Sequence, residues 1–298
     1  MTFGLSGIPA FEYYQPASLV DALMLRESNP QAMVYLGGSD IFPRLRSQAL
    51  SLNALIDLKT IRDFPATGYL PDGSLRINPQ TTFAELLPLL QRHSGYAVLR
   101  DAIRQLGTPS LRNRATLAGN ICNASPSADT LAPLLVLQAR VVVSSRQAQR
   151  CIPIDKFLLG PRQTACDRHE LLTEILLPPP LEAAGIYLKV SRNKAADLAI
   201  CGAAVMAMPA AGTPEHLQFR IAVSGANPVP IYLQQISDEL SQSTVTPDLL
   251  DKAARAAAQA VQPINDIRAS RRYRRAMVYE LVLQGLQACS AKAEGMRL

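Results

Sequence analysis

The chain has 298 residues, of which 48% are hydrophobic and 18% charged, and 30 Lys and Arg against 24 Asp and Glu leave a net charge of +6. This apolar content, with 22 Pro and 16 Gly that follow no period, excludes a disordered or fibrous protein. The excess of positive charge is small and dispersed over the chain, so we expect no nucleic-acid partner.

The predicted elements of the first half alternate between helices and short strands. Ser18 is an N-cap candidate, Thr82 and Glu85 form a capping box, and Gly107 ends a helix. In chain order we expect helices from 18 to about 29, over 86–91, 96–106 and 131–137, and strands over 33–36, 74–77, 140–143 and 172–176.

The pattern changes after Pro178–Pro180, which can continue neither a helix nor a strand. Beyond it we expect strands over 187–192, 199–208 and 219–224, followed by helices over 247–260 and 270–290. A run of strands followed by a run of helices is typical of α+β proteins. We therefore expect an α+β fold with a domain boundary near residue 180.

The start of the chain and the cysteines indicate a cytoplasmic protein. Residues 1–9 carry no basic segment followed by an apolar core, as a signal peptide would. The most apolar stretch, 198–212, is shorter than the ~20 residues of a membrane span. The five cysteines form no C-x-x-C pair, which gives no support for a disulfide framework or a metal site. They are Cys122, Cys151, Cys166, Cys201 and Cys289.

Two glycine-containing segments are candidates for ligand binding. Gly37-Gly38-Ser39-Asp40 directly follows a predicted strand, and successive N–H groups in such a turn can form an anion-binding nest. Residues 116–129 place hydroxyls, amides and a carboxylate before a helix that we expect to be buried. The alternatives are a strand-ending turn and a surface loop, and the chain has no P-loop or G-x-G-x-x-G motif. Two such segments together favour one extended anionic ligand held at both places.

These segments carry a resemblance to a known family. Leu36–Asp40 resembles the A-G-G-T-D loop of the FAD-binding subunits of molybdenum hydroxylases, and Leu111–Asn120 resembles their I-R-N-x-x-T-I-G-G-N segment. Further similar segments are 123–129, 171–175, 187–189 with Arg192 and Asp197, 220–223 and 270–275. The resemblance therefore covers nearly the whole chain in order, and the named group that it suggests is the xanthine dehydrogenase-like medium subunit.

The resemblance implies a p-cresol methylhydroxylase-type FAD-binding fold of two subdomains, followed by a smaller C-terminal α+β domain. We expect the FAD-binding domain over 1–180, with subdomains of about 1–59 and 60–180. The C-terminal domain, over 181–298, is expected to hold a three-stranded antiparallel sheet with helices.

The resemblance also implies that FAD binds non-covalently, with its pyrophosphate along both glycine segments. Thr116, Gly119 and Asn120 would contact the diphosphate, while Leu171 and Lys189 would border the flavin. A lysine there would raise the flavin potential, although a solvated surface lysine is the ordinary alternative. The expected cofactor-binding residues are Val34, Tyr35, Leu36, Gly37, Gly38, Ser39, Asp40, Ile41, Leu106, Thr116, Leu117, Ala118, Gly119, Asn120, Ser125, Asp129, Leu171 and Lys189.

The implied function is electron transfer. In the family, a large subunit carries the molybdenum cofactor (molybdopterin), a small subunit carries [2Fe–2S] clusters, and FAD on this chain passes electrons to NAD or another acceptor. Leu36 and Ala118 replace smaller residues of the family pattern, which leaves a flavin-free structural or assembly subunit as an alternative. A hydrolase is a remote third hypothesis, because the histidines are far apart and none is paired with a nucleophile.

Two further features have ordinary alternatives. Cys122 lies inside the second segment, where a buried thiol acting as a small apolar group is the usual interpretation. A basic run near the C-terminus is either a solvated or internally paired face, or a docking surface for an acidic partner subunit. Its members are Arg268, Arg271, Arg272, Arg274 and Arg275.

Overall fold

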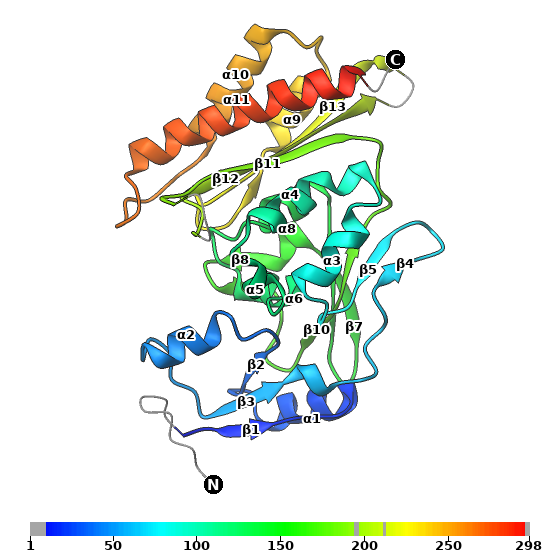
Figure 1. Cartoon of the computed structure of the whole chain (residues 1–298), viewed down its shortest axis with the longest axis vertical. Helices are drawn as coiled ribbons and strands as arrows, with labels where there is room; N and C mark the ends of the chain where they lie inside the picture. The colour runs from blue at the N-terminus through cyan, green and yellow to red at the C-terminus, as the bar shows by residue number, and fades with distance from the viewer. Residues whose placement is uncertain (1–9, 194–196, 211–212, 296–298) are drawn as a thin grey trace.

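A computed structural model describes residues 10–193, 197–210 and 213–295. Figure 1 shows an elongated molecule in which three layers follow one another in chain order, from a small N-terminal sheet to a C-terminal sheet covered by two long helices. Residues 1–9, whose sequence does not match a signal peptide, lie outside the described residues. Among the described helices, none is long and apolar enough to cross a bilayer.

The N-terminal layer is a parallel sheet with the strand order β1-β3-β2. Its strands are β1 (Glu12–Tyr14), β2 (Met33–Tyr35) and β3 (Ala54–Asp57), connected through α1 (Leu19–Ser28) and α2 (Ile41–Arg46). Side chains of β3 alternate between two clusters: Ile56 packs in the main core, and Leu55 packs with Leu45 of α2. The sheet is therefore covered on both faces, and the chain leaves β2 directly into the glycine turn.

The middle layer is an antiparallel sheet with the order β4-β5-β10-β6-β7. Its strands are β4 (Gly68–Tyr69), β5 (Leu75–Ile77), β10 (Leu171–Leu177), β6 (Arg140–Ser144) and β7 (Gln149–Pro153). The accompanying helices are η1 (Leu58–Thr60), α3 (Phe83–Leu90), η2 (Ser94–Tyr96), α4 (Ala97–Gln105), α5 (Pro109–Arg112), α6 (Leu117–Asn123), α7 (Leu131–Val136) and α8 (Ile154–Phe157). A small hairpin of β8 (Leu158–Gly160) and β9 (Gln163–Thr164) completes the layer.

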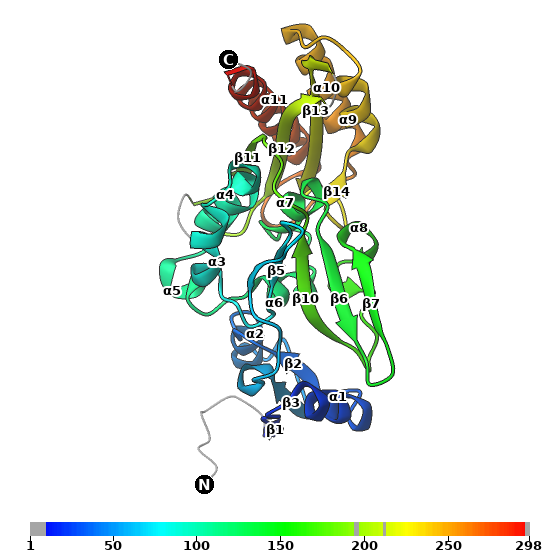
Figure 2. The same cartoon turned by 90° about the vertical axis from the view of Figure 1, so that its right-hand side faces the viewer.

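The C-terminal layer is an antiparallel sheet with the order β11-β12-β13-β14. Its strands are β11 (Ala184–Val190), β12 (Cys201–Ala210), β13 (Thr213–Ser224) and β14 (Ile231–Tyr232), followed by α9 (Gln234–Ser241), α10 (Pro247–Ala260) and α11 (Arg271–Gly295). Figure 2 shows these last helices on one side of the sheet and α4 and α7 toward the middle layer.

The nearly continuous apolar sequence of β12 follows from burial on both of its faces. Val205 belongs to the cluster formed with α10 and α11, and its neighbour Met206 belongs to the main core. Helix α11 approaches the strand closely, because a Cβ atom at Gly285 would lie 2.6 Å from Val205 Cγ2. A strand buried on both faces does not need polar residues at alternate positions.

Most predicted elements are confirmed, and so is the α+β class. The Thr82 capping box forms as expected: the hydroxyl accepts from Glu85 N, and the Glu85 carboxylate accepts from Thr82 N at 2.9 Å. Two expectations need correction. The polar segment 116–129 is not one loop but contains α6, and the C-terminal sheet has a fourth strand, β14. Both elements are too short for a sequence period to show them.

Candidate functional site

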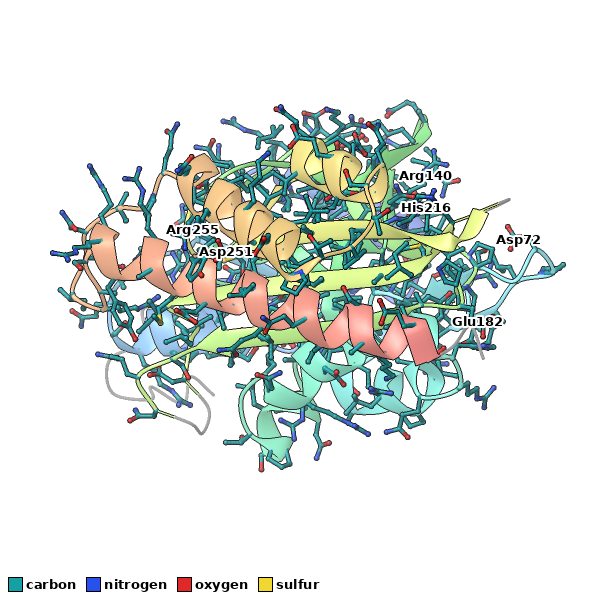
Figure 3. All side chains as sticks on the ribbon, turned by 90° about the horizontal axis from the view of Figure 1, so that it is seen from above. Asp72, Arg140, Glu182, His216, Asp251 and Arg255 are labelled. Carbon is teal, nitrogen blue, oxygen red and sulfur yellow. The ribbon has the colours of Figure 1, made fainter. Side chains whose placement is uncertain are left out.

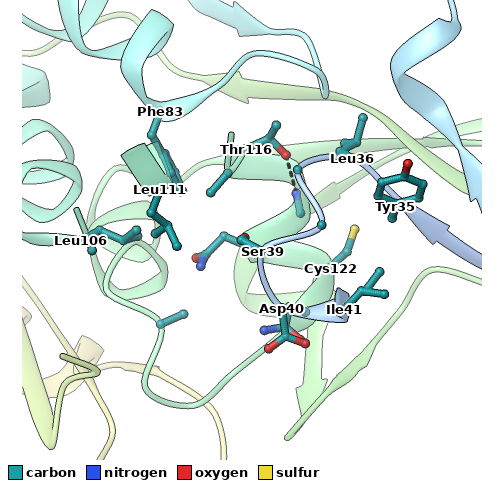
Figure 4. A pocket seen from close by; sticks show the side chains of 18 of the residues that line it. Tyr35, Leu36, Ser39, Asp40, Ile41, Phe83, Leu106, Leu111, Thr116 and Cys122 are labelled. Atoms are coloured by element: carbon teal, nitrogen blue, oxygen red, sulfur yellow. Dashed lines mark hydrogen bonds between the residues drawn. The ribbon is translucent and has the colours of Figure 1, made fainter. Parts of the chain in front are cut away.

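A pocket lies where the turn after β2 meets α6 and the segments that follow α4 and β11. Its volume is about 710 Å³, within the range of roughly 300–1,000 Å³ that is typical of small-molecule sites. Figure 4 shows Ser39 and Asp40 on one side of it, with Thr116 and Cys122 nearby and Leu106 and Leu111 at another side.

The two glycine segments touch each other in this pocket. A Cβ atom at Gly37 would lie 2.2 Å from the carbonyl oxygen of Arg114 and 2.9 Å from Ala115 Cα. Only glycine allows this backbone-to-backbone contact. Gly38 adopts φ +69°, a left-handed conformation in which a side chain would also meet the ring of Phe42. The turn after β2 and the start of α6 therefore form one crevice.

The turn after β2 presents free backbone donors. The N–H groups of Gly38, Ser39, Asp40 and Ile41 donate to no acceptor among the residues that the structure describes. Successive N–H groups of this kind form a concave site for anions. The turn therefore provides a donor set that suits a phosphate.

The second segment uses its donors differently. Thr116 is the N-cap of α6, and its hydroxyl accepts from Gly119 N at 3.0 Å. A Cβ atom at Gly119 would have Thr116 Oγ1 at 3.2 Å as its nearest neighbour, so Gly119 leaves room in the pocket. The side chain of Asn120 accepts a bond of 2.6 Å from the Thr130 hydroxyl. Because the Gly119 N–H is already bonded to the Thr116 hydroxyl, Gly119 offers no free donor. Its contribution is the space that lets a ligand approach α6 closely.

Two arginines that the sequence analysis did not single out line the pocket. The Asp40 carboxylate accepts from Arg44 Nη1 at 3.2 Å and from Arg162 Nη1 at 3.3 Å. Arg162 Nη1 also donates to Asn123 Oδ1 at 2.6 Å. Arg162 therefore connects the turn after β2 with the end of α6.

The backbone holds Arg162 in this place. Arg162 has φ +59°, an uncommon left-handed conformation for a residue with a side chain. Its N–H donates to the carbonyl of Ala124, which is itself left-handed with φ +43°. Strained backbone of this kind is frequent at functional sites.

A buried ion pair closes another end of the pocket. Asp129 is 5% exposed, and its carboxylate accepts from Lys189 Nζ at 2.9 Å and from the Tyr187 hydroxyl at 2.8 Å. Burial raises the pKa of Asp129, and Lys189 and Tyr187 oppose that rise. Lys189 Nζ also donates to the Gln105 carbonyl at 2.9 Å. β11 thus supplies the groups that balance the Asp129 charge.

The structure brings most of the predicted residues to the pocket wall. They are Val34, Tyr35, Leu36, Gly37, Gly38, Ser39, Asp40, Ile41, Leu106, Thr116, Gly119, Asn120 and Asp129. Five others lie outside the lining: Leu117, Ala118, Ser125, Leu171 and Lys189. The expectation that Cys122 is buried is wrong. Cys122 is exposed in the pocket, because it lies one turn after Gly119 on the open face of α6.

Comparisons with known proteins agree with this geometry. Residues 9–180 match the family described as the FAD binding domain in molybdopterin dehydrogenase, and residues 186–289 match the CO dehydrogenase flavoprotein C-terminal domain. The chain is 30% identical to a putative xanthine dehydrogenase FAD-binding subunit of Escherichia coli (strain K12), over 95% of this chain and 97% of that protein. It is 27% identical to the carbon monoxide dehydrogenase medium chain of Hydrogenophaga pseudoflava, over 95% of this chain and 98% of that one.

A solved structure of carbon monoxide dehydrogenase from Hydrogenophaga pseudoflava has the same fold, with a TM-score of 0.86 at 27% identity over 95% of this chain and 98% of the matched chain. These matches confirm the expected FAD-binding fold, FAD as the cofactor and the oxidoreductase class. The chain therefore belongs to the family of FAD-binding medium subunits of molybdenum hydroxylases.

Proposed function

We propose that this chain receives electrons from [2Fe–2S] clusters on a small partner subunit and passes them through FAD to NAD or another acceptor. A large subunit with the molybdenum cofactor would oxidise the organic substrate, and the complex would work in the cytoplasm. The observation that carries this proposal is the crevice in which Gly37 packs on the backbone of Arg114, with free N–H groups beside it. FAD would supply the redox chemistry, and the protein would bind and orient it.

The pocket suits a dinucleotide diphosphate. The free N–H groups of residues 38–41 would donate to phosphate oxygens, and the bare Gly119 would let the phosphates approach α6. In the structure, Arg44 and Arg162 are both bonded to the single Asp40 carboxylate. With FAD bound, these two cations would also balance the negative charge of the diphosphate. Leu106, Leu111 and Leu198 line the pocket elsewhere and would suit an apolar ring system.

Lys189 and Leu171 would support the site from behind the pocket wall. The Lys189 ammonium makes three bonds, to Asp129, to the Gln105 carbonyl and to the Asp197 carbonyl. We propose that Lys189 acts on the flavin through Asp129, because an ion pair produces a weaker field than a free cation. Leu171, which is buried in the main core, would fix β10 beneath α6.

The alternative of a flavin-free assembly subunit receives less support from the geometry. Ala118 is buried and does not line the pocket, so its methyl group does not narrow the site. Leu36 does line the pocket, but it is nearly buried and packs in the main core. Neither substitution removes the crevice.

Titration of the purified apoprotein with FAD tests the proposal. We expect saturable binding, a yellow holoprotein and release of FAD on denaturation. A chain that shows no saturable binding would favour the assembly subunit.

The acceptor is tested separately: holoprotein reduced in the absence of oxygen is mixed with NAD or a quinone, and the rate of flavin reoxidation is compared between them.

Co-purification of the tagged chain from its host tests the proposed partners. We expect two further subunits, with molybdenum and iron in the purified complex. A chain that elutes with FAD but without these subunits and metals would contradict the proposed relay while leaving FAD binding intact.

A further inference from the structure

The segment that connects α10 to α11 exposes apolar side chains. We call residues 262–273 the connecting segment. Ile267 is 97% exposed and Ile264 is 63% exposed, and Tyr273 is 43% exposed at the start of α11. Single exposed apolar residues are common, but a group of them rimmed by polar residues marks an interaction surface. Figure 3 shows α10 and α11, which this segment joins, lying side by side over the C-terminal sheet.

The connecting segment is ordered by its own hydrogen bonds. The Asp266 carboxylate accepts from the N–H groups of Arg268 at 2.9 Å and Ala269 at 3.1 Å. Asn265 Oδ1 accepts from Arg271 N at 2.6 Å, and Arg271 Nε donates to the Pro263 carbonyl at 2.9 Å. Ile267 is therefore presented on a preorganised turn, which reduces the entropy lost when a partner binds.

The same short stretch of chain carries the basic run, Arg268 to Arg275. Of the basic run, only Arg274 is buried, and it forms a two-bond ion pair of 2.8 Å with Asp266. Arg268 and Arg272 form no ion pair within the part of the chain that the structure describes. Arg274 is therefore internally paired, and Arg271 is bonded to the Pro263 carbonyl, whereas for Arg268 and Arg272 a solvated face and a docking surface are the alternatives that stay. The other four arginines bring positive charge into the same stretch of chain as exposed Ile264 and Ile267, a combination that suits an interface with an acidic partner.

Arg274 connects this surface to the candidate FAD pocket. Its Nη1 donates to the carbonyls of Ile200 and Gly225, the latter at 2.7 Å. Gly225 N in turn donates to the Pro126 carbonyl at 2.7 Å. Ile200 lies two residues after Leu198, and Pro126 directly precedes Ser127; both Leu198 and Ser127 line the pocket. Through the Asp266–Arg274 ion pair, the connecting segment is thus linked to backbone close to the candidate FAD pocket.

We propose that the connecting segment docks an acidic surface of the iron–sulfur subunit, with Ile267 as the apolar anchor and Arg268 and Arg272 as the steering charges. This inference rests on the proposed function, which requires an electron donor beside the flavin. The place of the surface suits that requirement, since Arg274 links it to backbone within two residues of the pocket-lining Leu198. Ile267 provides affinity, and Arg272, which is exposed, together with half-buried Arg268 provides salt-dependent association.

The experiment measures association of the FAD-loaded chain with the purified iron–sulfur subunit, by calorimetry at low and high ionic strength. The variants are Ile267→Asp and the double variant Arg268→Glu, Arg272→Glu. The matched controls are Val20→Asp, which replaces a 59% exposed residue of α1 at the other end of the molecule, and Arg92→Glu, which reverses an exposed charge after α3. FAD content is measured for each variant after denaturation.

We expect both surface variants to weaken association at least tenfold with full FAD content, and both controls to leave it unchanged. The double variant should also lose most of the salt dependence seen for the native chain. Native association in both surface variants overturns the proposal, and so does binding of nucleic acid at this surface together with unchanged subunit assembly. A native chain that takes up no FAD would instead contradict the proposed function, so the two failures are distinguishable.

Discussion

The substitution Gly119→Val tests where the diphosphate lies. The nearest atom to a Cβ at this position is Thr116 Oγ1 at 3.2 Å, and the methyl groups of valine would extend into the pocket. They would separate a phosphate from the start of α6. The displaced phosphate would also move away from the free N–H groups of residues 38–41. Hydrogen bonds to a charged group contribute about 1.5–3 kcal/mol each, so losing one or two of them corresponds to roughly 3 kcal/mol. We expect the Kd for FAD to rise about 100-fold, since 1.4 kcal/mol corresponds to a factor of ten.

The fold should tolerate this change. Glycine is disfavoured in a helix by about 1 kcal/mol relative to alanine, and valine by less, so helix propensity favours the variant slightly. Crowding of the Thr116 cap by the valine side chain would lower the stability of the fold by about 1 kcal/mol at most. The apoprotein should therefore unfold within a few degrees of the native temperature, roughly the shift that ~1 kcal/mol produces.

Flavin fluorescence titration measures the affinity, and thermal unfolding of the apoprotein measures the stability. Gly37→Ala is the contrasting control, because its Cβ would lie 2.2 Å from the Arg114 carbonyl oxygen and must push backbone apart. That variant should lose stability and FAD binding together. An unchanged Kd for Gly119→Val in a folded protein would show that the diphosphate is bound elsewhere.

Two further predictions concern charges. Arg162→Gln removes a cation bonded to Asp40 and Asn123. In the same titration, we expect the affinity for FAD to fall about tenfold at low salt and less at high salt. An equal loss of affinity at both salt concentrations would contradict a charge effect. Arg150 lowers the pKa of Glu170 through a 2.7 Å ion pair. The pair therefore stabilises the folded protein fully at pH values above the unfolded-state pKa of Glu170. This stabilisation is lost as the pH falls through the lower folded-state pKa. Urea unfolding between about pH 7 and pH 3 should therefore show a smaller acid-induced loss in Arg150→Gln than in the native chain, and parallel curves would refute the assignment.

The domain boundary near residue 180 stays a prediction. Pro178–Pro180 lie between β10 and β11, and separate expression of residues 1–180 would test whether the first part folds alone. The main core includes Tyr187 and Met206 from beyond that point, so we expect the isolated fragment to be less stable than the whole chain.

Local patterns were sufficient for elements whose stabilising residues are close in sequence. Thr82 and Glu85 are three residues apart, and the capping box that they form was predictable from their identities. β12 was predictable because ten largely apolar residues indicate a strand covered on both faces. Helix α6 was missed because seven residues containing glycine and two asparagines show no helical period, and its formation depends on the Thr116 cap and on burial of Leu117 and Ile121.

By itself, the sequence determined the two glycine segments, the residue types that an anionic ligand needs and the family to which the chain belongs. The tertiary structure alone decided which groups meet: Gly37 touches Arg114, Arg162 reaches Asp40 across 122 positions, and Lys189 is balanced by Asp129 rather than free. Backbone conformation and capping are local, so residue identity reveals them. Ion pairs and close backbone contacts between distant segments depend on how the layers pack. The spacing of these residues along the chain does not reveal how far apart they lie in space.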